Sequence, residues 1–491
     1  MNEENSINNS YKQLSKARLF IENFLVYGLG SVISKIVPLI MLPIITRLMP
    51  NTEYFGISDL SNTAVNFGAA VAVLGMYDAM YRIFFDKDDE TFKKSICSTT
   101  MLFTTILSII VTVVMLLGRT LIARFFFGDV KYSYLVIITA LTTLVTATNN
   151  IVAAPTRMQN KRKVFLVTNT ISPILSYSIS IPLILSGHYI IALPLGTLIS
   201  GTTLELIFWC LNHTWFDIKL FNKKYLKPLL AIAIPLFPNF LIYWVFNSSD
   251  KLMITNLLNV GEAGVYSIGA KLGTASQLIY TAFAGGWQYF AFSTMKEDDQ
   301  VESNSRIFEY LGIMSFITTS FICAWSYGIY KLFFTGDYVR GFIIAPYLFL
   351  APLLQMLFQV AANQFIVIKK TWPNMLILSS GALVNIIFNY FMIPVIGIEG
   401  AAIATLLGYC ISDVVCCVVL IKMKLMVLSK RFVVCSLLIT AFFFIWRWTA
   451  TTHILIGTLM AVVFTGILLC IYRDAVGRVI NKLRNTRKHA A

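Results

Sequence analysis

Charged and amide side chains recur at helical spacing inside segments of this chain that are otherwise apolar. They lie in four segments, which begin near Phe24, Ile57, Leu229 and Val265, and comprise Lys35, Asp59, Asn62, Asn66, Asn247, Asp250, Lys251 and Lys271. If these segments face one another, the side chains line a hydrated cavity that binds a polar, anionic ligand. The alternative is a set of neutralised pairs, such as Asp250 with Lys271, that only fix helix register.

Two further patterns suggest movement and ion coupling. Glu205 and Asp413 lie 208 residues apart and could take up and release protons, or they could be helix-end acids neutralised by cytoplasmic Lys and Arg. Prolines interrupt two of the apolar segments at comparable places, and we expect gating or hinge positions at Pro38, Pro43, Pro235 and Pro238. The alternative for the prolines is simple packing, since proline is common in membrane helices.

The composition predicts that helices in a membrane carry these side chains. Apolar residues make up 57% of the 491 residues and charged residues 13%. Apolar runs of about 20 residues, the length that crosses the hydrocarbon core as a helix, begin near residues 24, 57, 96, 135, 165, 190, 229, 265, 307, 342, 375, 401, 432 and 454. We therefore predict an all-α polytopic membrane protein with 14 transmembrane helices.

An internal repeat divides these helices into two sets of six. Ile45-Thr46 returns as Ile254-Thr255, an offset of 209, and Gly128-Asp129 returns as Gly336-Asp337, an offset of 208. Six spans are an even number, so the repeats run parallel. The predicted organisation is an N-terminal tail (1–19), an N-lobe (20–212), a linker (213–227), a C-lobe (226–422), an appended helix pair (431–472) and a basic tail (473–491).

The net charge of +15 is best explained by topology. Most Lys and Arg fall on alternate loops and on the two tails, so the positive-inside rule places both termini in the cytoplasm. The sequence contains no basic segment interleaved with aromatic residues, which is the pattern that would suggest nucleic-acid binding. Neither a phosphate-binding G-x-x-x-x-G-K-[ST] motif nor a zinc-binding H-E-x-x-H motif occurs in the sequence. We therefore expect no enzymatic activity, cofactor or metal.

Two runs closely resemble the signature of a known family. Residues 247–254 (NSSDKLMI) and 260–267 (VGEAGVYS), with Lys271, resemble bacterial polysaccharide flippases of the multidrug/oligosaccharidyl-lipid/polysaccharide exporter (MOP) superfamily. Residues 43–47, 53–56 and 287–290 match as well, and the resemblance covers nearly the whole chain. It implies a MATE-like fold in the bacterial inner membrane. It also implies outward movement of an undecaprenyl-diphosphate-linked oligosaccharide, such as an O-antigen unit, by alternating access.

The resemblance also implies partners and leaves alternatives. The expected partners are the lipid-linked oligosaccharide, the bilayer, and a polysaccharide polymerase with its chain-length regulator. A peptidoglycan-precursor flippase of the same superfamily would carry an arginine-rich cavity, whereas the deep basic residues here are lysines. A drug/cation antiporter would need an acidic cavity, which Asp59, Asp250 and Glu205 leave open. A membrane-embedded glycan polymerase would need a large outer loop, and every predicted outer loop is short.

Overall fold

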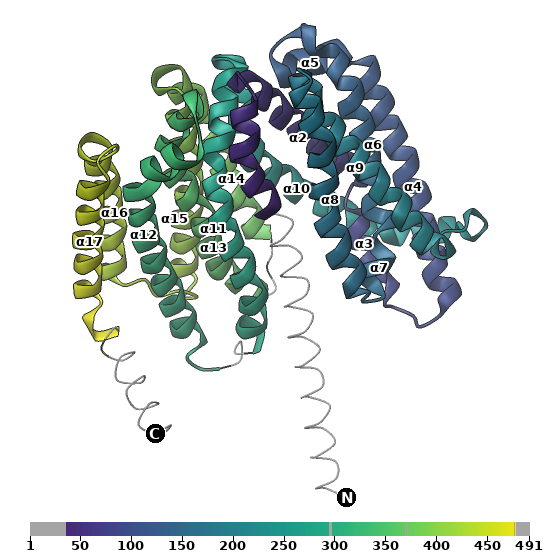
Figure 1. The fold of residues 1–491 in the computed structure, drawn as a ribbon. Coiled ribbons are helices and arrows are strands. Elements are labelled where there is room, and N and C mark those ends of the chain that lie inside the picture. Colours follow the sequence, from purple (N-terminus) through teal and green to yellow (C-terminus); the bar gives the residue numbers. More distant parts are fainter. Residues whose placement is uncertain (1–35, 294–296, 369, 371, 476, 478–491) are drawn as a thin grey trace, which may run out of the picture. The chain divides into compact units, whose positions relative to one another are not determined.

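All regular secondary structure in the described part of the chain is helical, as the sequence predicts. The computed structural model describes residues 36–293, 297–368, 370, 372–475 and 477 (Figure 1). Lipid offers no partner for backbone N–H and C=O groups, so a helix, which satisfies them internally, is the expected form for each apolar segment. The prediction of an all-α membrane protein is confirmed.

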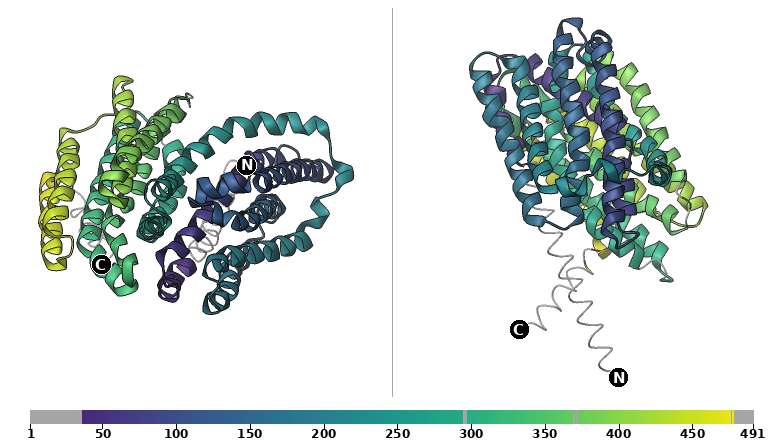
Figure 2. Two further views of the ribbon diagram at one scale, coloured as in Figure 1. Left: turned by 90° about the horizontal axis from the view of Figure 1, so that it is seen from above. Right: turned by 90° about the vertical axis from the view of Figure 1, so that its right-hand side faces the viewer.

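The contacts divide the chain into two compact units, Met1–Gly264 and Val265–Ala491. The described helices of unit 1 are Ile36–Leu48, α2 (Thr52–Val73), α3 (Met76–Phe84), α4 (Glu90–Leu117), α5 (Arg119–Phe127), η1 (Val130–Tyr134), α6 (Leu135–Val152), α7 (Ala154–Met158), α8 (Arg162–Leu185), α9 (Tyr189–Asn212), η2 (His213–Trp215), η3 (Ile218–Leu220), α10 (Lys223–Leu257) and the first turn of α11 (Val260–Ser293). The long helices of this unit, drawn in blue and teal, run side by side in the right-hand view of Figure 2.

Unit 2 contains the remainder of α11 and the helices that follow it. These are α12 (Gln300–Phe333), η4 (Gly336–Ile343), α13 (Ala345–Val367), α14 (Trp372–Ile396), α15 (Ile398–Lys422), α16 (Lys430–Thr449) and α17 (Ile454–Ile471). Helix α15 packs against α13 and α14, and α12 packs against α13, α16 and α17. The lobe boundaries inferred from the repeat, 20–212 and 226–422, stay a prediction. The contacts divide the chain at a different place, since they group α10 with unit 1.

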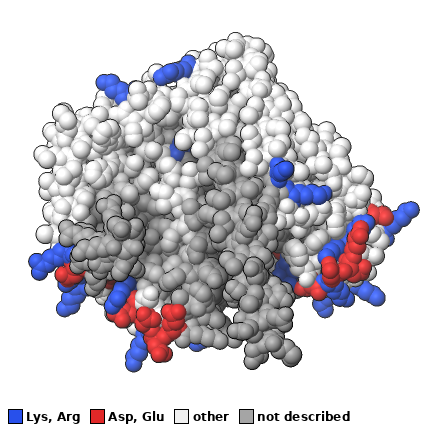
Figure 3. Space-filling model, turned by 60° about the horizontal axis from the view of Figure 1, so that its bottom comes forward, with Lys and Arg blue, Asp and Glu red and all other residues white. Residues whose placement is uncertain are grey.

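Eleven helices in the described residues are long and apolar enough to cross a membrane, and the bent pair of α2 and α3 makes a twelfth. Of the two other predicted spans, one coincides with α11, and the other begins near residue 24, so that only its later part, in the short helix Ile36–Leu48, lies within the described residues. Neither is counted among the twelve, so the predicted number of fourteen is not confirmed. In the face drawn in Figure 3, most of the red and blue side chains lie in clusters at the lower left and the lower right, and most of the described surface above them is white. This distribution is typical of a protein whose flanks face lipid.

The predicted second span is bent by 47° between α2 and α3. Leu74 and Gly75 both adopt a positive φ, of 48° and 75°, which ends one helix and starts the next. A side chain at position 75 would also press against the backbone oxygen of Ala233 on α10, at 2.7 Å from the new Cβ. Position 75 therefore requires glycine for both conformation and close approach.

The internal repeat is visible in the local conformation of the backbone. Gly128 after α5 has φ 72° and precedes η1, and Gly336 after α12 has φ 59° and begins η4. Gly187 before α9 and Gly397 before α15 likewise have positive φ, of 85° and 65°. The two copies of the sequence thus break their helices at matching points.

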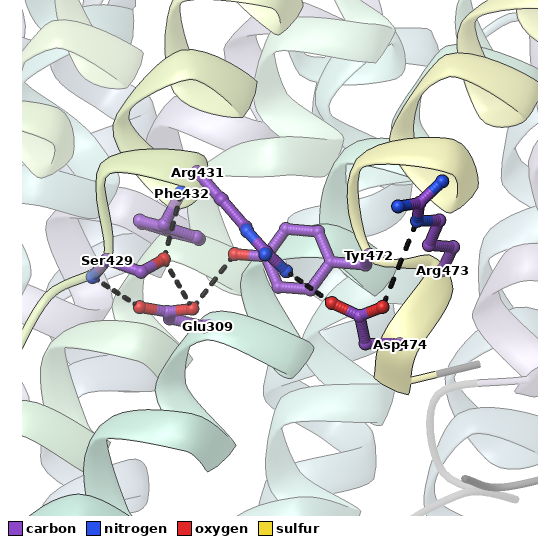
Figure 4. A network of polar contacts seen from close by, with 7 residues as sticks. All are labelled: Glu309, Ser429, Arg431, Phe432, Tyr472, Arg473 and Asp474. Carbon is purple, nitrogen blue, oxygen red and sulfur yellow. Dashed lines mark hydrogen bonds and ion pairs between the residues drawn. The ribbon is translucent and has the colours of Figure 1, made fainter. Parts of the chain in front are cut away.

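A polar network joins the appended helix pair to α12 (Figure 4). The buried carboxylate of Glu309 accepts hydrogen bonds from the backbone N–H of Ser429 at 2.6 Å, from the hydroxyl of Ser429 at 2.8 Å and from the hydroxyl of Tyr472 at 2.9 Å. Ser429 caps the start of α16, and Tyr472 follows the end of α17. One acid therefore holds the ends of both appended helices, which explains how a pair outside the repeat is fixed to unit 2.

The first turns of α2 and α11 approach closely through glycine. A methyl group added to Gly264 would collide with the backbone oxygen of Thr52, and one added to Gly56 would collide with that of Val260. We expect Gly264→Ala to destabilise the protein by about 1–3 kcal/mol, because the two backbones must separate. The check is the melting temperature of the purified protein. Gly466→Ala on α17 is the matched control, because an added methyl group there meets nothing within 4 Å. Equal melting temperatures for the two variants would contradict the expectation.

Candidate functional site

The structure brings together two of the predicted site residues, Asp59 on α2 and Lys251 on α10. Lys251 Nζ lies 2.5 Å from Asp59 Oδ2, and the side chains are 18% and 9% exposed. The two helices also meet where the indole of Trp244 donates to the backbone oxygen of Thr63 at 3.3 Å. The two charged groups, 192 residues apart in sequence, thus form a largely buried ion pair in a membrane-spanning region.

Close in sequence to this pair, α2 and α10 carry exposed polar side chains, here together called the amide surface. It consists of Asn62, Asn66, Tyr243 and Asn247. Asn247 lies one helical turn from Lys251, and its side-chain amide nitrogen donates to the backbone oxygen of Tyr243 at 2.7 Å. Amide groups that faced hydrocarbon would lose their hydrogen bonds to water. The amide surface is therefore suited to water or to hydroxyl-rich ligands.

The ion pair changes the expected electrostatics of the site. The ammonium group of Lys251 is balanced by Asp59, so an anionic ligand would have to compete with that carboxylate. Asp250 is buried, at 3% exposed, and Lys271 is partly buried on α11 in unit 2. Lys35 lies outside the described residues. The substrate-binding roles of all these residues, and the suggested pairing of Asp250 with Lys271, stay predictions.

The predicted hinge prolines lie within helices. Pro38 and Pro43 belong to the helix Ile36–Leu48, and Pro235 and Pro238 lie inside α10. The helix α10 continues for 35 residues through its prolines, so they do not divide it into separate elements. Their gating role stays a prediction.

The two symmetric acids have different surroundings. Glu205 on α9 is half-buried and within reach of the side chains of Thr148 and Trp209. Asp413 on α15 is 8% exposed, and neither of its oxygens has a hydrogen-bond partner among the residues described. Both interpretations of the two acids, proton exchange and neutralisation at a helix end, stay predictions.

Asp413 lines a large groove in unit 2, a cavity of about 1070 Å³ between α12, α13, α14, α15 and α16. Near one end of this groove, Arg447 Nε lies 2.7 Å from Glu399 Oε1, and the hydroxyl of Tyr347 donates to the same oxygen at 3.1 Å. Sequence reasoning missed this triad, because Arg447 and Glu399 lie near helix ends where charges are normally solvated. No group of three or more His, Cys, Asp or Glu that could hold a metal ion occurs in the described ranges.

The arrangement of helices is shared with known transporters. The chain is similar to the lipid II flippase MurJ in an inward closed conformation, with a TM-score of 0.67 and 16% identity over 92% of this chain and 100% of that one. It is also similar to an inward-facing multidrug resistance MATE family transporter of the MOP superfamily, with a TM-score of 0.61 and 14% identity over 80% and 98%. A MATE structure in the straight conformation gives 0.55 and 15% over 83% and 95%. These likenesses define the MATE and MurJ type of membrane fold.

The family follows from the sequence itself. Residues 44–341, more than half of the chain, match the family described as "Polysaccharide biosynthesis protein". A search of curated proteins found no match. The chain belongs to this polysaccharide biosynthesis family and has the fold of the MOP superfamily.

Proposed function

We propose that this protein flips undecaprenyl-diphosphate-linked oligosaccharide units, of O-antigen or a similar surface polysaccharide, across the bacterial inner membrane. The units move from the cytoplasmic to the periplasmic leaflet by alternating access, and the N- and C-termini lie in the cytoplasm. The protein moves its substrate and catalyses no covalent reaction. The observation that carries the proposal is the amide surface beside the ion pair of Asp59 and Lys251, in a protein of the polysaccharide biosynthesis family.

The chemistry of this surface suits a sugar joined to a phosphate. Asn62, Asn66 and Asn247 offer both donors and acceptors, which sugar hydroxyl groups require. Lys251 offers an ammonium group that can turn from Asp59 to a phosphate oxygen without leaving the polar region. The remaining charged residues of the proposed substrate-binding site are Lys35, Asp250 and Lys271. The proposed hinges, which permit the helices to bend during the transport cycle, are Pro38, Pro43, Pro235 and Pro238.

The two solved relatives supply the competing functions. MurJ is a lipid II flippase, which would make the substrate a peptidoglycan precursor, and the MATE relative is a multidrug resistance transporter. The paired lysine and the amide surface favour a sugar-rich substrate over a cationic drug, because a cation would favour unpaired acids. We propose that a polysaccharide polymerase and its chain-length regulator receive the product.

Deletion of the gene in its host tests the proposed function. We expect loss of surface polysaccharide, accumulation of lipid-linked units on the inner leaflet, and no change in sensitivity to cationic dyes. Restoration of surface polysaccharide by the wild-type gene on a plasmid is the control. Unchanged polysaccharide with increased dye sensitivity would favour a drug antiporter, and lysis with loss of peptidoglycan would favour a lipid II flippase.

A further inference from the structure

The groove of unit 2 contains a buried acid, Asp413, whose carboxyl group receives no hydrogen bond from the described residues. Asp413 lines the groove and is 8% exposed, and neither carboxyl oxygen has a hydrogen-bond partner in the part of the chain that the structure describes. Most side chains in the wall are aliphatic or aromatic. An ionised carboxylate in such a buried, apolar environment is strongly unfavourable.

Among the described residues, the arginine that lines the groove is already paired with an acid. Arg447 on α16 is held by Glu399 at 2.7 Å, and Tyr347 on α13 donates to the same acid. Glu399 precedes Asp413 by 14 residues on α15, which corresponds to about 21 Å along the helix. The Glu399–Arg447 pair therefore leaves no net charge near Asp413. Helix α14, which packs against α15, contains no Asp, Glu, Lys, Arg or His between Trp372 and Ile396.

The other polar side chains of the groove also suit a neutral acid. Ser436 and Thr440 on α16 line the groove, and their hydroxyls already donate to the backbone oxygens of Phe432 and Ser436, each at 3.0 Å. They can still accept a hydrogen bond, which a protonated carboxyl can donate and a carboxylate cannot. The titratable neighbours on α15 itself include the phenol of Tyr409, one helical turn before Asp413, and three thiols, which are weak donors: Cys410, Cys416 and Cys417.

The repeat allows Asp413 to be compared with the corresponding acid of the first copy. Glu205 occupies the equivalent place in the first copy, 208 residues earlier, but has the side chains of Thr148 and Trp209 within reach. Both copies thus carry an acid at this point, and among the described residues the acid of the second copy has no hydrogen-bond partner.

We propose that Asp413 is a proton-binding site in the groove of unit 2. Its carboxyl keeps the proton while the groove is dry. When water enters, the O–H bond breaks, the electron pair stays on the carboxylate and the proton passes to a water molecule. The inference rests on the proposed function, because release of this proton on one side of the membrane and uptake on the other would couple transport to a proton gradient.

Infrared difference spectroscopy of the purified full-length protein tests the site independently of transport. We expect the wild type to show the C=O stretch of a protonated carboxyl that changes between about pH 5 and about pH 9. Asp413→Asn should fold normally, because asparagine has the shape of the neutral acid, and should lack this signal. Asp413→Glu should retain it, and Glu205→Gln, the matched variant of the other copy, should retain it too.

The same variants link the site to transport. A protonophore should lower polysaccharide export by the wild type and should not lower the residual export of Asp413→Asn. Absence of the carboxyl signal in the wild type, or its persistence in a folded Asp413→Asn, would overturn the proposal. If the signal behaves as expected but deletion leaves surface polysaccharide unchanged, the proton site stands and the proposed substrate is wrong.

Discussion

Asp59→Asn is expected to abolish polysaccharide export and to lower the melting temperature of the purified protein. The substitution leaves the ammonium group of Lys251, 18% exposed, without its carboxylate. Breaking a buried ion pair from one side costs about 3–5 kcal/mol, because the remaining charge stays buried. The measurements are thermal unfolding in detergent and surface polysaccharide in a deletion strain.

A double variant separates stability from function. Asp59→Asn with Lys251→Gln removes both charges, so we expect most of the lost stability to return while export stays low, because the group that binds phosphate is absent. Asp86→Asn is the matched control, since its ion pair with Arg82 is equally short, at 2.5 Å, but exposed, and such pairs contribute about 0–1 kcal/mol. Normal export by the stable double variant would show that the pair has only a structural role.

Single cysteines on the amide surface are expected to react much faster with a hydrophilic thiol reagent than cysteines on the lipid-facing flank. The test positions are Asn62, Asn66 and Asn247, in a protein whose eight native cysteines have been replaced. The thiolate reacts, and it forms readily only in water. A rise of one unit in thiol pKa alone lowers the thiolate fraction about tenfold. The labelling rate is measured in intact membranes.

The controls for labelling are chosen by exposure. Val114 and Leu117 on α4 are 60% and 82% exposed but lie in an apolar span, and Leu60 on α2 is fully buried. We expect cysteines at all three to react slowly. If Val114→Cys labels as fast as Asn62→Cys, the amide surface does not face water. Labelling of Asn62→Cys that falls on addition of the lipid-linked substrate would place the substrate at this surface.

Much of the architecture follows from the sequence, because lipid imposes strong constraints on a chain. An apolar run of about 20 residues in hydrocarbon must be helical. The repeat could also be read directly, and the paired glycines Gly128 and Gly336 adopt the same left-handed backbone conformation in both copies. The sequence did not indicate that α10 would pack with the first unit, because periodicity shows which residues share a helix face and not which helix lies beside it.

The same limit applies to the candidate site. Asp59 and Lys251 could each be selected, because charges in apolar spans are rare. Their pairing could not, since it depends on how α2 and α10 meet. Glu309 and Ser429 gave no sequence signal, because the acid sits in a helix with ordinary polar neighbours and its partners lie 120 or more residues away. Asp413 was found through the repeat, but the structure was needed to show that its carboxyl oxygens have no hydrogen-bond partner among the described residues.

Reconstitution of the purified protein in liposomes tests the central claim most directly. Liposomes carrying a fluorescent undecaprenyl-diphosphate oligosaccharide are sampled with a membrane-impermeant reagent that modifies only the sugar on the outer leaflet. We predict that the wild type makes inner-leaflet sugar accessible, and that the folded double variant of Asp59→Asn with Lys251→Gln does so much more slowly. The account would be contradicted if sugar became accessible no faster with the wild type than in protein-free liposomes, while the same preparation transported a cationic dye.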